Sequence, residues 1–193
     1  MEVLTAQTHG TPGSDTNTLV KLTNFQHLKL RIYSSREAKA MLDSPVIESG
    51  NLQSLAMYSS SRTFGKFPSL QSLSRCHILH ILQLQGPIED QGVNPCRHCL
   101  RFLPASLSKL TLLYSCIYQD PMPVVKKLPN LRLLRLCNIT YCGFEMVCSA
   151  GGFPKLETLQ LSSLPSLEKW EIEKDAMPSL ERLHIKDIFP NRV

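Results

Sequence analysis

One recurring motif constrains the fold of this chain more than any other feature. The motif has an apolar residue, two variable residues, a Leu, one variable residue and a second apolar residue, and it occurs seven times. Its central leucines are Leu28, Leu55, Leu82, Leu110, Leu134, Leu159 and Leu183, at spacings of 27, 27, 28, 24, 25 and 24 residues. Recurrence at such a regular interval indicates a stack of similar structural units.

The spacing inside the motif predicts the structure of each unit. The last two apolar residues are two positions apart, so in a β-strand both point to one side while the residues between them point to the other. One unit cannot bury its apolar side alone, so neighbouring units stack. We therefore predict an α/β leucine-rich-repeat solenoid of about seven irregular repeats. Its parallel sheet forms the concave side, and loops, 3-10 turns and short helices form the convex side. A Leu-rich helical domain, the alternative, would show a period of 3.6 residues.

The turns after the strands depart from the usual repeat. An Asn or Cys commonly stands three residues after the last apolar strand residue, where it satisfies buried backbone groups. This chain has other residues there, namely Pro87, Ser115, Ile139, Leu164 and Ile188. We therefore expect looser and more variable turns.

The two ends differ from the middle. Residues 1–18 are polar and rich in Thr and Gly, so we expect a disordered or irregular N-terminal edge there and a leucine-rich-repeat domain over residues 19–193. A solenoid needs caps on its apolar ends, and the sequence shows none. We therefore expect either a fragment of a longer protein or a truncated gene product.

Composition narrows the class of protein. The chain has 193 residues, of which 42% are hydrophobic and 19% charged, so it can form a packed core. Charged residues interrupt every apolar stretch, which predicts no membrane-spanning helix, and the N-terminus has no signal-peptide pattern. Seven cysteines, an odd number, favour a reducing compartment. We expect a cytoplasmic location.

The C-terminal third carries a family resemblance. Its segments are residues 128–136, 141–143, 146–156, 164–170 and 176–183, and residues 103–107 and 22–25 fit the same pattern. Together they resemble the leucine-rich repeats of plant intracellular disease resistance proteins, the coiled-coil class of nucleotide-binding leucine-rich-repeat (NLR) immune receptors. The resemblance covers about residues 19–186.

The resemblance implies a role in defence. In this family the array restrains a nucleotide-binding domain and takes part in recognising pathogen proteins. It therefore implies protein partners, namely the chain's own or a related nucleotide-binding domain, a pathogen effector or a guarded host protein. This sequence has no phosphate-binding G-x-x-x-x-G-K-[ST] motif, and its nearest string, Ser61 to Phe67, lacks the first glycine. We expect no cofactor.

Two other functions stay open at this point. Leu134-Arg135-Leu136-Cys137 also resembles the repeats of F-box proteins, which would make the chain the substrate-recognition array of a ubiquitin ligase. Asn138-Ile139-Thr140 is a glycosylation sequon, which would matter in a secreted receptor ectodomain.

Residues with chemical potential show no catalytic arrangement. Cys96-Arg97-His98-Cys99 is a C-x-x-C motif, but zinc requires four ligands, and only Cys76 and His77 lie one repeat away. We interpret the motif as part of a convex loop and predict neither a metal site nor an enzyme. Trp170 follows Leu167 at three residues, which predicts that it anchors a convex turn in the core.

The outward strand positions predict a binding face. The candidate residues are Lys29, Arg31, Tyr58, Gln83, Gln85, Lys109, Arg135, Gln160, Arg182, His184 and Lys186. The outward set, which also includes Cys137, has several basic residues and no Asp or Glu, whereas Glu168, Glu171, Glu173 and Asp175 make one convex stretch acidic. We predict that this face binds an acidic protein surface. The alternative is that its charges only keep the sheet soluble. Nucleic acid is disfavoured because stacking aromatics do not alternate with the basic residues.

Overall fold

Each motif forms one strand in the computed structural model, which describes residues 3–7, 25–59, 65–89 and 99–188. The seven motif strands are β2 (His27–Ile32), β3 (Ser54–Ser59), β4 (Ile81–Gln85), β5 (Lys109–Leu113), β6 (Leu133–Cys137), β8 (Thr158–Ser162) and β10 (Arg182–Lys186). The predicted number of repeats is therefore confirmed within the described part of the chain.

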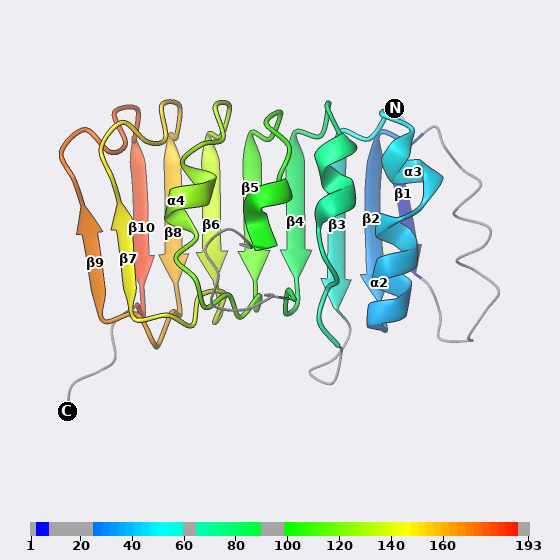
Figure 1. The fold of residues 1–193 in the computed structure, drawn as a ribbon, viewed down its shortest axis with the longest axis horizontal. Coiled ribbons are helices and arrows are strands. Elements are labelled where there is room, and N and C mark those ends of the chain that lie inside the picture. Colours follow the sequence, from blue (N-terminus) through cyan, green and yellow to red (C-terminus); the bar gives the residue numbers. More distant parts are fainter. Residues whose placement is uncertain (1–2, 8–24, 60–64, 90–98, 189–193) are drawn as a thin grey trace.

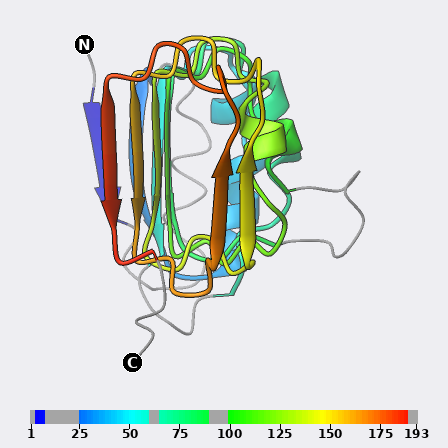
Figure 2. The ribbon, with the colours of Figure 1, turned by 90° about the vertical axis from the view of Figure 1, so that its left-hand side faces the viewer.

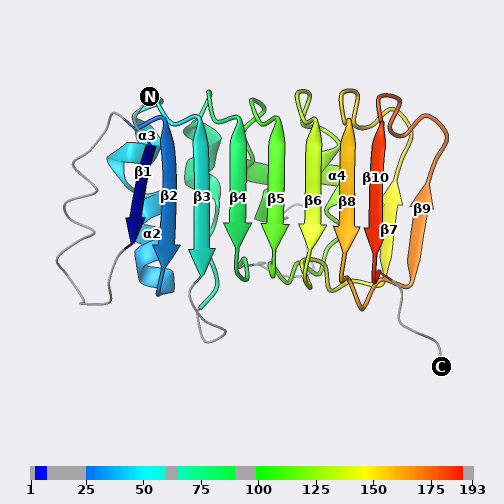
Figure 3. The same ribbon diagram turned by 180° about the vertical axis from the view of Figure 1, so that it is seen from behind.

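The motif strands build one parallel sheet together with an additional strand, β1 (Val3–Gln7). The strand order is β1-β2-β3-β4-β5-β6-β8-β10, and Figure 3 shows the strands side by side and pointing the same way. Strand β1 pairs with β2 in parallel. The structure thus differs from the prediction for residues 1–18 at Val3–Gln7, where the chain continues the sheet; residues 8–18 lie outside the described residues.

A second layer covers one face of this sheet (Figures 1 and 2). It contains α2 (Ser35–Leu42), α3 (Pro45–Glu48), the 3-10 helices η1 (Gln71–Arg75) and η3 (Cys99–Phe102), and α4 (Met122–Val125). Towards the C-terminus the layer changes to β7 (Glu145–Cys148) and β9 (Lys169–Ile172), which pair in parallel as a small second sheet. The helices and turns were predicted, whereas the second sheet was not.

The core lies between the two layers. We call the two rows of side chains that point into it the inward ladder: Leu28, Leu55, Leu82, Leu110, Leu134, Leu159 and Leu183 in one row, and Leu30, Met57, Leu84, Leu112, Leu136, Leu161 and Ile185 in the other. From β2 to β8 every member is buried. Burying a Leu side chain contributes about 1.5–3 kcal/mol, so this ladder is the main source of stability.

The ladder is exposed at β10. Leu183 and Ile185 are 44% and 45% exposed, because no described strand lies beyond β10 in the sheet. The motif predicted both residues as core. The last strand of an array has the same pattern as the others but only one neighbour, and the pattern cannot show that difference.

The turns after the strands are more uniform than the sequence predicted. The position two residues after the second ladder residue has a positive φ after five strands, at Gly86, Tyr114, Asn138, Ser163 and Asp187. Only Gly adopts this conformation without cost, so the packing of the repeats holds the other four residues in it. Backbone bonds link successive turns, for example from Asn138 N to the Ser162 carbonyl (3.0 Å).

Thr140 replaces the missing Asn after β6. Its side chain is buried, and its hydroxyl lies 2.8 Å from the Leu112 carbonyl and also contacts the Cys137 carbonyl. A buried carbonyl without a partner would destabilise the fold. The repeat therefore satisfies these groups with a hydroxyl placed one residue after the expected position.

Candidate protein-binding surface

The face of the large sheet that turns away from the helices is the predicted concave side, and we call it the open face (Figures 2 and 3). Each of the seven motif strands contributes three alternate residues, and the register aligns them in three rows. The first row is His27, Ser54, Ile81, Lys109, Leu133, Thr158 and Arg182; the second is Lys29, Ala56, Gln83, Thr111, Arg135, Gln160 and His184; the third is Arg31, Tyr58, Gln85, Leu113, Cys137, Ser162 and Lys186.

All eleven candidate residues lie on this face, in the rows that the sequence predicted. The structure brings Arg135, Gln160 and His184 side by side on β6, β8 and β10. Their position is therefore confirmed, while their role in binding stays a prediction. Cys137 is the exception among the outward residues, because its side chain is only 6% exposed and contributes to the interior rather than to the surface.

The charge of the open face is one-sided. Six Lys and Arg residues and two His residues occupy the three rows, and the rows contain no Asp or Glu. The ion pairs Arg75–Glu48, Arg132–Glu157 and Lys169–Glu171 all join side chains outside these rows. A face of this kind attracts negative charge and raises the rate at which an acidic partner associates.

Two contacts between neighbouring strands organise the basic side chains. The Lys29 ammonium lies 5.2 Å from the centre of the Tyr58 ring, within range of a cation–π interaction. Burial raises the pKa of Tyr58, so its phenol stays neutral near pH 7. At the other end, Arg182 Nε donates to Thr158 Oγ1 at 3.0 Å and covers that residue.

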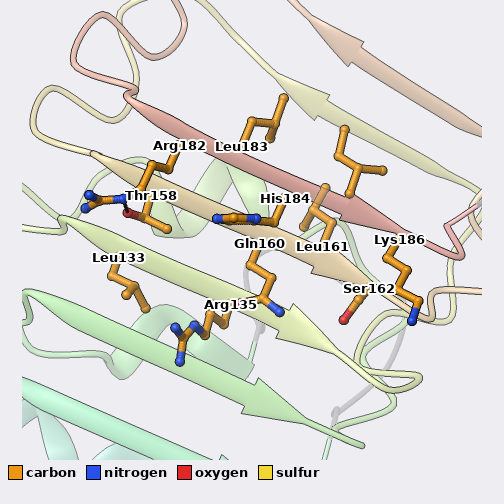
Figure 4. A pocket seen from close by; sticks show the side chains of 11 residues that line it. Leu133, Arg135, Thr158, Gln160, Leu161, Ser162, Arg182, Leu183, His184 and Lys186 are labelled. Carbon is orange, nitrogen blue, oxygen red and sulfur yellow. Dashed lines mark hydrogen bonds between the residues drawn. The ribbon is translucent and has the colours of Figure 1, made fainter.

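The C-terminal part of the open face contains a shallow hollow of about 780 Å³, shown in Figure 4. Its polar lining comes from β6, β8 and β10 and includes Arg135, Gln160, Arg182, His184 and Lys186. Leu183 and Ile185 also line it, and sequence reasoning missed them because they belong to the inward ladder. The hollow thus combines four basic or imidazole side chains with exposed apolar surface, which is the composition of a protein-binding patch.

The opposite side of the molecule has a different charge. Glu168, Glu171, Glu173 and Asp175 are exposed in and around β9, as the sequence predicted for the convex side. Trp170 lies in β9 rather than in a turn, packs partly buried against the core, and donates from Nε1 to Cys148 Sγ at 3.4 Å. The prediction that it anchors the convex layer is confirmed.

Other candidate chemistry finds little support in the described residues. Cys96, Arg97 and His98 lie outside them, as do Ser61 to Thr63 of the string nearest to a phosphate-binding loop, whereas Cys99 is buried in η3. Burial raises the pKa of the Cys76 thiol to about 11, which favours a structural role. Within residues 3–7, 25–59, 65–89 and 99–188, no group of three or more His, Cys, Asp and Glu side chains could hold a metal ion. The helices in those ranges are all too short and too polar to cross a bilayer.

Strand order, register and ladder together define the class of protein, a leucine-rich-repeat solenoid. No family model matches the chain. Among curated proteins it is similar to "Disease resistance protein RPP8" of Arabidopsis thaliana, with 32% identity over 92% of this chain and 19% of the relative. "Probable disease resistance protein RXW24L" of the same plant is 31% identical over 86% of this chain and 22% of the relative. "Probable disease resistance protein RF45" is 40% identical over 64% of this chain and 13% of the relative.

The chain is therefore related to the leucine-rich-repeat region of NLR-type plant disease resistance proteins, as the sequence motifs indicated. It spans only about a fifth of the length of these relatives. All three are named as disease resistance proteins, which favours the immune-receptor interpretation over the F-box alternative.

Proposed function

We propose that this chain is a protein-recognition module in plant defence, and that its open face binds an acidic protein surface. The observation that carries the proposal is the basic, carboxylate-free character of the open face in a relative of disease resistance proteins. An isolated leucine-rich-repeat array has no signalling chemistry of its own, so its contribution is to bind and to restrain. We accordingly propose that it is not an enzyme.

The first partner that we propose is a nucleotide-binding domain, either the chain's own in a longer protein or that of a related receptor. The family resemblance supports this partner, because there the array keeps the nucleotide switch inactive. A pathogen effector or a guarded host protein would compete for the same face or bind beside it. A cytoplasmic location fits the six described cysteines, which all carry thiols and form no disulfide bonds in the described residues.

Charge reversal on the open face tests the proposal. The variant Lys109→Glu/Arg135→Glu places two carboxylates on neighbouring strands, where both side chains are exposed. We expect it to lose co-purification with the nucleotide-binding domain, because each reversed charge now repels the acidic partner. The full 193-residue chain serves as bait, with the nucleotide-binding domain of the receptor RPP8 as the first probe.

A matched control separates position from net charge. Arg36→Glu/Lys127→Glu makes the same change in charge at exposed residues on the helical side, and should leave co-purification unchanged. Circular dichroism must show the same fold for both variants. Unchanged co-purification of the Lys109→Glu/Arg135→Glu variant would contradict the proposal, as would equal losses in the two variants.

A further inference from the structure

Two cysteines that play no part in the open face come together where the chain leaves β5 and β6. Cys116 follows β5 by three residues and Cys142 follows β6 by five. The two strands are neighbours in the sheet (Figure 3), so the segments that leave them also run side by side.

Backbone hydrogen bonds hold the two segments together. Cys116 N donates to the Ile139 carbonyl (3.2 Å), and Ile117 N donates to the Thr140 carbonyl (2.8 Å). Cys142 N donates in return to the Ile117 carbonyl at 2.8 Å, and Ile117 pairs with Tyr141 in a parallel bridge. In this arrangement the two thiols lie within hydrogen-bonding range of each other.

The pair is also the most accessible of the described cysteines. Cys116 and Cys142 are half-buried, whereas Cys76, Cys99, Cys137 and Cys148 are buried. Their neighbours Tyr118 and Phe144 are 67% and 63% exposed, so the pair lies near the surface of the molecule. A small reagent can reach these thiols without unfolding the repeat.

We propose that Cys116 and Cys142 form a dithiol modification site that a peroxide converts into a disulfide bond between two adjacent repeats. One thiolate attacks a peroxide oxygen, which breaks the O–O bond and gives a sulfenic acid and hydroxide. The second thiolate then attacks the sulfenic sulfur, forms the S–S bond and expels hydroxide. Two electrons pass from the sulfurs to the peroxide, and the two thiol protons end in two water molecules when the oxidant is hydrogen peroxide.

The environment of the pair sets how fast it reacts. Burial, together with the adjacent Cys116 thiol, raises the pKa of Cys142 to about 11. Because the thiolate is the reacting form, the oxidation is slow at neutral pH and accelerates as the pH rises towards 11. This places the site among slow, stabilising cross-links and not among fast peroxide sensors.

The disulfide would change the molecule in a defined way. It closes a loop that contains α4 and β6, and so removes conformational freedom from the unfolded chain. It also fixes the edge at which β5 and β6 exit, where Thr140 already satisfies two carbonyls. We expect the oxidised chain to unfold at a temperature about 5 °C higher than the reduced chain.

Peptide mapping of the unmodified chain tests the site directly. The reduced 193-residue protein is treated with hydrogen peroxide at pH 8, its remaining thiols are blocked with N-ethylmaleimide, and the digest is analysed by mass spectrometry. We expect a cross-linked peptide that joins Cys116 to Cys142, has lost two hydrogen atoms and disappears on reduction with dithiothreitol. The yield at a fixed time should increase with pH.

Serine variants give a second readout. Cys116→Ser and Cys142→Ser should each abolish the cross-link and the rise in unfolding temperature, whereas Cys137→Ser, a buried control at the same edge, should keep both. Phenylarsine oxide, which bridges two neighbouring thiols, should bind the unmodified chain and fail to bind either variant. Full N-ethylmaleimide labelling of both cysteines after peroxide treatment would overturn the proposal, as would a peroxide-induced cross-link confined to Cys96 and Cys99.

Discussion

The first and last repeats build the same sheet but cover it differently. The three connections from β2 to β5 correspond to motif spacings of 27, 27 and 28 residues and contain α2, α3 and the two 3-10 helices. The two connections from β6 to β10 correspond to spacings of 25 and 24 residues and contain β7 and β9 instead. We call these the helical repeats and the strand repeats.

The comparison shows how repeat length sets the convex structure. A helix advances about 1.5 Å per residue, whereas a strand advances about 3.3 Å. The eight residues of α2 therefore cover about the same length as the four residues of β7. A shorter repeat crosses the convex side in an extended conformation, and the hydrogen bonds that a helix makes internally are then made between β7 and β9.

The largest expected effect tests whether the two groups of repeats share one core. Leu82→Ala in β4 and Leu134→Ala in β6 both remove a fully buried side chain from the inward ladder. Each should lower the free energy of unfolding by about 2–5 kcal/mol, measured by urea denaturation. Leu183→Ala in β10 should cost clearly less, because that side chain is already 44% exposed. A much smaller cost in one of the two buried positions would show that the regions do not unfold together.

A smaller effect is expected where the chain leaves β6 and the strand repeats begin. Thr140→Val keeps the shape of the side chain but removes the hydroxyl that contacts the Leu112 and Cys137 carbonyls. Loss of these contacts in a buried site should cost about 1–3 kcal/mol in the same denaturation experiment. Thr140→Ser retains the hydroxyl and should recover part of the loss. If Val were tolerated without cost, the carbonyls would have other partners and the comparison with an Asn turn would fail.

The smallest effect belongs to the helical repeats. Ser34 begins α2 as its N-cap, and its hydroxyl accepts a hydrogen bond from Glu37 N at 3.2 Å. Ser34→Ala should cost about 1 kcal/mol of stability. Ser35→Ala, one residue further into the helix, serves as the control and should cost less. Equal costs would indicate that packing of α2 against the sheet, and not its cap, determines where the helix begins.

The sequence predicted the sheet side of the molecule well for a physical reason. Alternation with a period of two specifies both which residues form the ladder and which form the open face, so the positions of Lys29, Arg135 and Lys186 followed from the motif alone. The pattern carries no information about the number of neighbours of a strand. For that reason the exposure of Leu183 was missed.

The convex side was harder to predict. Strands β7 and β9 have short, mixed patterns, Glu-Met-Val-Cys and Lys-Trp-Glu-Ile, that give little periodic signal. Strand β1 lacks the leading apolar residues of the motif and was therefore assigned to an irregular edge. The contact between Cys116 and Cys142 depends on how two irregular segments align, and no local rule of spacing specifies that alignment.

The uniform register of the large sheet gives the open face the properties of a grid. Neighbouring strands are about 4.8 Å apart, and alternate residues along a strand are about 6.6 Å apart, so each outward side chain has a fixed address. A substitution at one address changes which chemical group is displayed there without moving the others. A partner surface is then matched position by position, and new specificities can arise from single substitutions while the scaffold beneath stays the same.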